Sequence, residues 1–126
     1  MPALQNATDT PLLRSDADGV VTLTLNRPQQ FNPLSEAMLD ALQRELDALS
    51  CDDEVRCVVL AGAGKVFCAG HDLREMRSQP RLGYYQDLFA PCSRVMQGIQ
   101  TLPVPVIARV HGIATAAGCQ LVASCD

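Results

Sequence analysis

Apolar residues gather in short segments whose patterns predict β-strands. In residues 20–26 apolar and polar positions alternate, which indicates a strand with at least one buried face. Residues 55–61 and 104–110 are apolar runs of the kind found in strands buried within a parallel sheet. Residues 11–14 precede a turn sequence at 16–19 and are expected to form an edge strand.

A second pattern repeats every three to four residues and predicts helices. Residues 35–50 place apolar side chains on one face, and Ser35 is a suitable N-cap because its hydroxyl can accept from an unpaired amide. Residues 81–102 carry a longer apolar stripe. Pro91 should kink or split that helix because proline lacks the amide hydrogen. The expected stripe consists of Tyr85, Leu88, Phe89, Cys92, Val95, Met96, Ile99 and Leu102.

Shorter helical segments are expected at residues 72–77 and 116–124, so strands and helices alternate along the chain. This order predicts an α/β fold. With 126 residues the chain has room for one domain. We divide it into a flexible N-terminal lead with an edge strand, residues 1–18, and the main part, residues 19–126.

Composition excludes several classes of function. The net charge of -4 and the 4% aromatic content argue against a nucleic-acid partner. No apolar stretch is long enough to span a membrane, and residues 1–16 lack the features of a signal peptide. We therefore expect a cytoplasmic protein that binds neither nucleic acid nor membrane, with the mitochondrial matrix as the alternative if the source is eukaryotic.

Six cysteines are present, and their spacing matches no zinc motif and no Cys-x-x-Cys pair. Reduced, buried thiols are expected because free cysteine behaves as a small apolar residue. His71 and His111 are the two histidines, and so few imidazoles argue against a metal site. No metal or separate cofactor is predicted.

Two stretches of small residues each follow a predicted strand and lead towards a helix. They are Phe-Cys-Ala-Gly-His-Asp-Leu at 67–73 and His-Gly-Ile-Ala-Thr-Ala-Ala-Gly-Cys-Gln-Leu at 111–121. Small residues let a ligand approach the backbone, and the first amides of a helix have no partner within it. Two such turns lying side by side could direct two N–H groups at one oxygen atom, as in an oxyanion hole.

Other motif interpretations fit poorly. Residues 62–65 resemble a phosphate-binding loop, but Val59 and Val66 occupy positions where that motif needs glycine and a hydroxyl residue. Phe67 likewise replaces the third glycine of a dinucleotide fingerprint. A Gly-x-Ser-x-Gly elbow is absent, which disfavours a serine hydrolase.

Three motifs in register resemble the enoyl-CoA hydratase/isomerase, or crotonase, family. They are Leu-Asn-Arg-Pro at 25–28, Ala-Gly-His-Asp-Leu at 69–73, and the segment from Pro-Val-Ile-Ala at 105–108 through Gly112 to Cys-Asp at 125–126. The segment from Gly112 onward is most similar to the enoyl-CoA hydratase domain-containing proteins. The resemblance implies a crotonase-like spiral of ββα turns. It also implies members of about twice this length, of which the chain would be a truncated, N-terminal portion.

The resemblance assigns chemistry to the backbone of His71 and Ala117, whose N–H groups would hold the thioester oxygen and stabilise an enolate. The side chain of His71 has no role in that assignment. Many relatives carry glycine where Ala116 and Ala117 stand, and a Cβ there would narrow the pocket. We expect the helix terminus to accept alanine without strain.

Gln120 departs from the family pattern. Hydratases of the family carry a catalytic glutamate at this position, and an amide cannot take up a proton at neutral pH. The leading interpretation is an acyl-CoA-binding protein that carries out enoyl-CoA hydration or a related isomerisation. The alternatives are a non-catalytic acyl-CoA binder or regulator of the same fold, and an assembly piece.

Coenzyme A enters only as part of the substrate, and the resemblance implies several contacts with it. Gln30, Phe31 and Pro33 match the loop over adenine and pantetheine, and Ala69 and Leu73 match backbone contacts to the nucleotide end. Phosphate contacts are assigned to Arg27 and Arg74, with solvated arginines as the alternative.

Met76, Leu88 and Phe89 are candidates for an acyl pocket, although such a stripe is more often core. Asp72 is expected to cap a helical turn. The family also implies a homo-trimer or a hexamer for the full-length protein.

Overall fold

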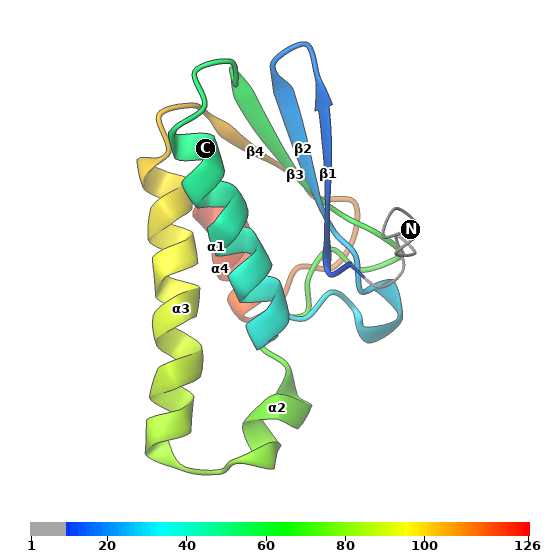
Figure 1. Ribbon diagram of the computed structural model, residues 1–126. Coiled ribbons are helices and arrows are strands. Elements are labelled where there is room, and N and C mark those ends of the chain that lie inside the picture. Colours follow the sequence, from blue (N-terminus) through cyan, green and yellow to red (C-terminus); the bar gives the residue numbers. More distant parts are fainter. Residues whose placement is uncertain (1–9) are drawn as a thin grey trace, which may run out of the picture.

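The computed structural model describes residues 10–126, so residues 1–9 of the predicted flexible lead lie outside the described residues. Its centre is a four-stranded sheet in the order β1-β2-β3-β4. The long helices lie along one side of this sheet (Figure 1). The α/β class predicted from the sequence is confirmed. The strands are β1 (Leu12–Ala17), β2 (Val20–Leu25), β3 (Cys57–Gly62) and β4 (Val106–Arg109).

The sheet begins as a hairpin and continues with parallel strands. β1 and β2 are antiparallel across Asp18 and Gly19, whose φ angles of 53° and 82° suit a two-residue hairpin loop. β3 is parallel to β2, and β4 is parallel to β3. Parallel neighbours need crossover connections, which α1 (Glu36–Ser50) and α3 (Leu82–Thr101) provide.

Helix α1 follows its predicted bounds closely. The Ser35 hydroxyl accepts a hydrogen bond from the Met38 amide at 3.1 Å, as expected of an N-cap. A second cap comes from Glu75, whose carboxylate accepts from the Glu36 amide at 3.0 Å. The apolar face of α1 is buried through Met38, Leu39, Leu42, Leu46 and Leu49.

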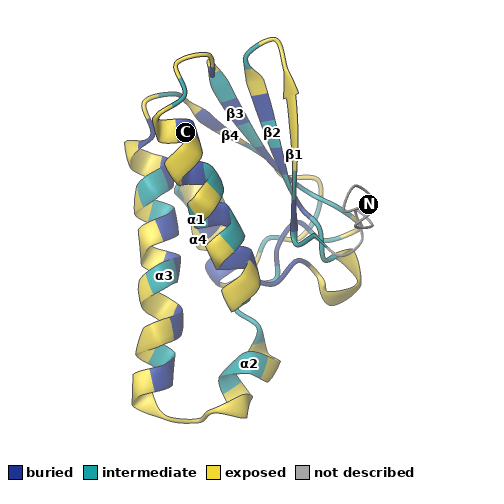
Figure 2. Ribbon diagram, in the orientation of Figure 1, coloured by how far each residue is buried: buried dark blue, intermediate teal, exposed yellow. Residues whose placement is uncertain are grey.

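Helix α3 runs without a break through Pro91, so of the two predicted effects the split is wrong and the kink stays a prediction. Buried residues on both sides of the proline hold the helix against α1, because burial outweighs the lost hydrogen bond. The buried stripe contains Tyr84 in place of the predicted Tyr85, and Phe89 is 42% exposed. The buried positions of α3 lie along the side that faces α1 (Figure 2).

Strand β4 is shorter and more exposed than its apolar sequence suggests. Val106 is buried, but Ile107 is 50% exposed and Val110 is 45% exposed. The prediction of a buried strand over 104–110 is therefore wrong for these positions. β4 is the last strand of the sheet formed by the described residues, so fewer neighbours cover it.

Three short helices complete the described chain: η3 (Pro28–Gln30), α2 (Leu73–Ser78) and α4 (Ala117–Ala123). Asp126 ties the end of α4 to the start of β4. Its carboxylate accepts from the Val106 amide at 2.9 Å, and its own amide donates to the Val106 carbonyl at 2.8 Å. Within residues 10–126 no helix has the length and apolar character needed to cross a membrane.

Candidate functional site

The two stretches of small residues lie side by side, as expected from the sequence. Cys68 and Ala114 form a parallel β-bridge. The Cys68 amide donates to Ile113 at 3.2 Å, and the Thr115 amide donates to the Cys68 carbonyl at 3.1 Å. These bonds hold the segment after β3 against the segment after β4.

Glycines let the two turns approach without side chains between them. A Cβ on Gly118 would overlap the carbonyl oxygen of Cys68. A Cβ on Gly70 would lie 3.1 Å from the amide nitrogen of Ala117, and the φ angle of Gly70 is +93°. Gly70 immediately precedes His71, so the turn that carries His71 lies beside the start of α4.

The amides of His71 and Ala117 donate no hydrogen bond to any other residue in the described part of the chain. Ala117 is the first residue of α4, where the helix offers its amide no acceptor. At His71, the neighbouring bridge uses the Gly70 carbonyl, which accepts from the Leu34 amide at 2.7 Å. Two unpaired N–H groups therefore lie on adjacent turns, as an anion or a carbonyl oxygen would require.

Ala116 adopts a backbone conformation that favours glycine. Its φ is 52° and its ψ is -127°, and the Gly118 amide donates to the Thr115 carbonyl at 2.8 Å across the turn. This is the geometry of a type II′ turn, whose first central residue is usually glycine. The expectation that alanine fits here without strain is therefore wrong for Ala116.

The imidazole of His71 lies in a partly buried position against Phe89. The two rings meet edge to face, with centroids 5.0 Å apart and an angle of 62° between their planes. Nδ1 is buried and makes no hydrogen bond. Burial lowers the pKa of His71, and the backbone of Leu34 partly opposes this shift. The ring is thus neutral at physiological pH.

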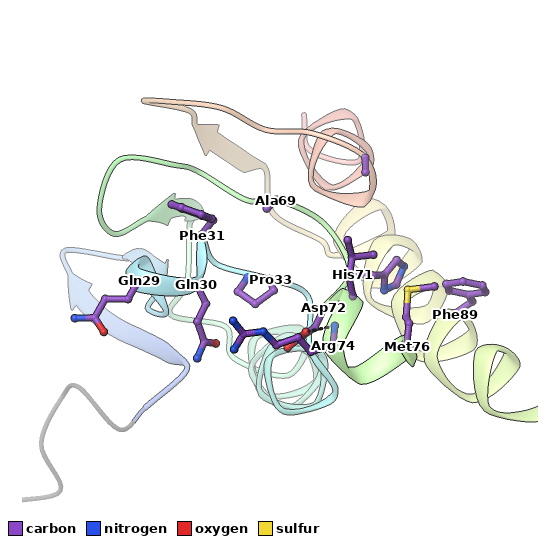
Figure 3. Close-up of a pocket in the computed structure, with 12 residues that line it drawn as sticks. Gln29, Gln30, Phe31, Pro33, Ala69, His71, Asp72, Arg74, Met76 and Phe89 are labelled. Carbon is purple, nitrogen blue, oxygen red and sulfur yellow. Dashed lines mark hydrogen bonds between the residues drawn. The ribbon is translucent and has the colours of Figure 1, made fainter. Parts of the chain in front are cut away.

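A cleft of about 560 Å³ opens beside this ring. Six of the seven residues assigned to coenzyme A binding line it, from η3, α2 and the loops that follow η3 and β3 (Figure 3). Arg27 is not among the lining residues, and its guanidinium donates to the Asn26 carbonyl at 2.9 Å. The six are Gln30, Phe31, Pro33, Ala69, Leu73 and Arg74.

A second cavity of about 380 Å³ holds the three residues assigned to catalysis, His71, Ala117 and Gln120. His71, Phe89 and Ala116 line both cavities, which therefore adjoin at these residues. Of the three candidates for an acyl pocket, Met76 and Phe89 line the larger cavity. Leu88 is 2% exposed and belongs to the core.

Asp72 lies at the cleft and caps α2, as predicted. Its carboxylate accepts from the amides of Arg74 at 2.9 Å and of Glu75 at 3.4 Å. Glu75 then reaches the N-terminus of α1, and burial raises the pKa of its carboxyl group. The carboxylates of Asp72 and Glu75 therefore each accept hydrogen bonds from a helix N-terminus.

Asn32 is a positioning residue that the sequence analysis did not identify. It is fully buried, with a φ of 52°, and its side-chain amide donates to the carbonyls of Ala63, Val66 and Phe67 at 2.9 to 3.1 Å. Its side-chain oxygen accepts from the Arg27 amide at 2.8 Å. The Asn-Pro pair at 32–33 was a usable turn signal, because asparagine tolerates positive φ.

The cysteines are free thiols of different exposure. Cys68 and Cys92 are buried and Cys57 and Cys125 are partly buried, but Cys51 and Cys119 are exposed, so the expectation of buried thiols is wrong for these two. Burial raises the pKa of Cys68 to about 11, which keeps its thiol protonated. Among residues 10–126 no group of three or more His, Cys, Asp or Glu side chains could hold a metal ion.

Known proteins are similar to this chain in sequence and in fold. Residues 15–126 match the enoyl-CoA hydratase/isomerase family. The chain is 44% identical over 118 residues to enoyl-CoA hydratase domain-containing protein 3, mitochondrial, of Xenopus laevis, covering 93% of this chain and 40% of that protein. The human protein of the same name is 41% identical over 116 residues, covering 92% and 38%.

Solved structures extend the comparison to the fold. An enoyl-CoA hydratase of Mycobacterium smegmatis matches with a TM-score of 0.90 at 67% identity, covering 92% of this chain and 46% of that one. Human enoyl-CoA hydratase domain-containing protein 3 matches with a TM-score of 0.88 at 42% identity, with the same coverage. The chain spans less than half the length of these relatives, and it has the predicted crotonase-like fold in part. Because the family match extends over nearly all of its residues, the chain belongs to the enoyl-CoA hydratase/isomerase, or crotonase, family.

Proposed function

We propose that this chain binds acyl-CoA thioesters and stabilises their enolates through the backbone amides of His71 and Ala117. The observation that carries the proposal is the pair of amides on adjacent turns, neither of which has an acceptor in the described part of the chain. Negative charge develops on the thioester oxygen as the enolate forms, so donors fixed in advance lower the barrier. Losing one such donor typically costs roughly 3 kcal/mol of transition-state stabilisation.

The lining of the larger cleft supports binding of the coenzyme A part of the ligand. It is lined by an exposed aromatic residue, Phe31, a backbone segment at Ala69, and the cation of Arg74. An aromatic face suits a purine ring, and a guanidinium suits a phosphate. A thioester that lies in this cleft would reach the second cavity at His71.

A non-catalytic acyl-CoA binder is the second candidate function. Gln120 lines the smaller cavity. The family resemblance implies that hydratases carry glutamate at this position. An amide there can orient a water molecule or a substrate oxygen, but it cannot exchange a proton. Hydration of an enoyl thioester is therefore the least supported of the family reactions.

The oxyanion hole can be tested by removing one N–H without removing a side chain. Ala117→Pro deletes the amide hydrogen at the first position of α4, where proline is tolerated. Leu82→Pro is the matched control, because Leu82 is the exposed first residue of α3 and lines neither cavity. We expect Ala117→Pro to slow exchange of the α-hydrogens of acetyl-CoA with solvent deuterium about a hundredfold.

Calorimetry with acetyl-CoA and an assay with crotonyl-CoA separate the candidate functions. Binding with α-hydrogen exchange supports the enolate site, and binding without exchange supports the non-catalytic binder. Absence of binding would refute both. Gln120→Glu shows whether a carboxylate at this position gives hydration activity, which is measured as loss of the conjugated enoyl absorbance of crotonyl-CoA. Gln100→Glu, at an exposed position, is the control for the added charge.

We also propose a homo-trimer or a hexamer for the full-length protein. Apolar side chains at the sheet edge support an assembly, because Ile107, Val110 and Ile113 are exposed on and beyond β4. Light scattering coupled to gel filtration gives the mass directly. A monodisperse monomer at micromolar concentration would contradict this proposal.

The cytoplasm remains our proposed location, with the mitochondrial matrix as the alternative. The names of the vertebrate relatives place those proteins in mitochondria. Fractionation of source cells, followed by immunodetection, distinguishes the two compartments.

A further inference from the structure

We propose that the imidazole of His71 is the proton acceptor of this site, which isomerises β,γ-unsaturated acyl thioesters to their α,β-unsaturated forms. This inference rests on the proposed function, because the same residue's backbone amide would hold the thioester oxygen. It extends that proposal by naming the side chain that moves the proton in the isomerisation already considered.

The position of the ring is the first argument. His71 is one of three residues that line both cavities, and the other two, Phe89 and Ala116, carry no titratable group. If the coenzyme A part of a thioester lies in the larger cleft, the carbons next to its thioester carbonyl therefore lie close to this imidazole. Phe89 holds the ring by an edge-to-face contact at 5.0 Å. Figure 3 shows the ring directed towards Met76 and Phe89.

The second argument concerns the other polar groups that line the two cavities. The carboxylate of Asp72 already accepts two backbone hydrogen bonds, and Arg74 is a cation. Burial raises the pKa of the Cys92 thiol, which therefore keeps its proton. Gln120, contributed by α4, does not titrate. Within the described lining, His71 is the uncharged side chain able to accept a proton near neutral pH.

The protonation state of His71 agrees with this role. Nδ1 is buried without a hydrogen bond, so Nε2 is the ring nitrogen that can meet a ligand. Burial lowers the pKa of His71, and the ring is neutral and basic at pH 7. An imidazole ordinarily titrates close to physiological pH, which favours transfer of the proton in both directions.

The reaction conserves atoms and electrons without a further reactant. Nε2 takes a proton from the α-carbon, and the electron pair of that C–H bond enters a dienolate whose oxygen lies at the two backbone amides. The imidazolium then returns the proton to the γ-carbon, and the double bond moves to the α,β position. The ring ends neutral, and no group is oxidised or reduced.

His71→Gln is the decisive variant, because it keeps the backbone amide and a polar side chain but removes the titrating group. The assay follows conversion of 3-hexenoyl-CoA by the rise of conjugated enoyl absorbance, from pH 5 to pH 9. We expect unchanged protein to lose activity towards acid, with an apparent pKa below that of an ordinary imidazole, because burial lowers the pKa of His71. His71→Gln should be at least about a hundredfold slower at pH 7.5. Its pH profile should lack the acidic limb, which is the fall of the rate towards acid pH.

His111→Gln is the matched control, because His111 lies outside both cavities and its Nε2 contacts the Gly64 carbonyl at 2.6 Å. It should keep the rate and the pH profile of unchanged protein. His71→Ala assayed with added imidazole gives an independent readout, since recovered turnover would restore the missing base. If His71→Gln does not fold, the acidic limb of unchanged protein decides, and its absence overturns the proposal.

The outcomes separate this inference from the proposed function. Calorimetric binding of acetyl-CoA within about threefold of unchanged protein, with isomerisation lost in His71→Gln, supports both proposals. Isomerisation within tenfold of unchanged protein and the same acidic limb in His71→Gln overturn the role of the imidazole and leave the enolate site standing. Binding of acetyl-CoA without isomerisation by unchanged protein overturns this inference alone.

Discussion

At the scale of single residues, the site depends on backbone conformations that composition does not reveal. Ala116 has the φ and ψ of a glycine position, at the turn where α4 begins. Its Cβ also narrows the space beside Gly70, where an added Cβ would lie 3.1 Å from it. Strain of this kind typically costs about 1–3 kcal/mol.

Replacing Ala116 with glycine should relieve that strain. We expect Ala116→Gly to raise the free energy of unfolding by about 1 kcal/mol, because the relief exceeds the added freedom of the unfolded chain. Denaturant titration followed by circular dichroism measures the change. Ala123→Gly, at the exposed end of α4, should lower stability by about 0.5–1 kcal/mol. Equal losses in both variants would show that Ala116 is not strained.

Asn32 joins two loops that line the cleft through four hydrogen bonds. Asn32→Leu would leave one buried and two partly buried carbonyls without their donor, so we expect a loss of about 3 kcal/mol or more in the free energy of unfolding. Asn32→Asp should be comparably unstable, since a carboxylate cannot donate to those oxygens. Thermal unfolding gives the size of both losses. Gln29→Leu, at an exposed position of the neighbouring η3, should change stability by less than about 0.5 kcal/mol.

At the scale of elements, the sequence predicted the helices and strands well wherever one periodic face is buried. Ser35 marked the start of α1 correctly, and the α1 stripe is in the core. The failures have physical causes. Pro91 does not split α3, because packing against α1 overrides a local preference, and Ile107 is exposed because β4 has no further strand beside it among the described residues.

The candidate site was likewise predicted from the sequence only in part. Motif residues that follow β3 and β4 come together at the cavities, because the carboxyl ends of these parallel strands lie at the same edge of the sheet. The strain at Ala116 and the hydrogen bonds of Asn32 depend on how loops distant in sequence meet. Periodicity carries no information about such contacts.

Helix α3 should become more stable when its missing hydrogen bond is restored. Pro91→Ala supplies an amide that can donate to the Asp87 carbonyl one turn earlier. We expect a gain of about 1–2 kcal/mol in the free energy of unfolding, smaller than the cost of proline because the unfolded chain also gains freedom. Pro80→Ala, between α2 and α3, is the control and should be slightly destabilising. A loss in Pro91→Ala would mean that the helix needs the proline ring for packing.

At the scale of the whole molecule, buried titratable groups should set a pH window of maximal stability. Below about pH 6.5 the unfolded imidazole of His71 binds a proton more readily than the folded one, so stability falls as the pH falls. Above pH 9.0 the unfolded thiol of Cys68 ionises, whereas its folded pKa is about 11, so stability falls as the pH rises towards 11. Cys125, with a pKa of about 11, acts in the same direction.

Denaturant midpoints measured from pH 5 to pH 11 give this profile. His71→Gln should flatten the acidic side, and Cys68→Ala should reduce the slope between pH 9 and pH 11 although it also lowers stability throughout. A profile that is flat from pH 5 to pH 7 would contradict the burial of the His71 ring.

The glycines at the two turns have a consequence for how far this chain can diverge. A Cβ at Gly112 would overlap the Lys65 carbonyl oxygen, and one at Gly118 would overlap that of Cys68. In a library that samples all amino acids and is sorted for folded protein, we expect positions 112 and 118 to retain glycine, whereas position 119, which is exposed, accepts most residues. Tolerance to substitution therefore changes abruptly between the adjacent positions 118 and 119. The close approach of the two turns is conserved only in descendants that keep residues without a Cβ at positions 112 and 118.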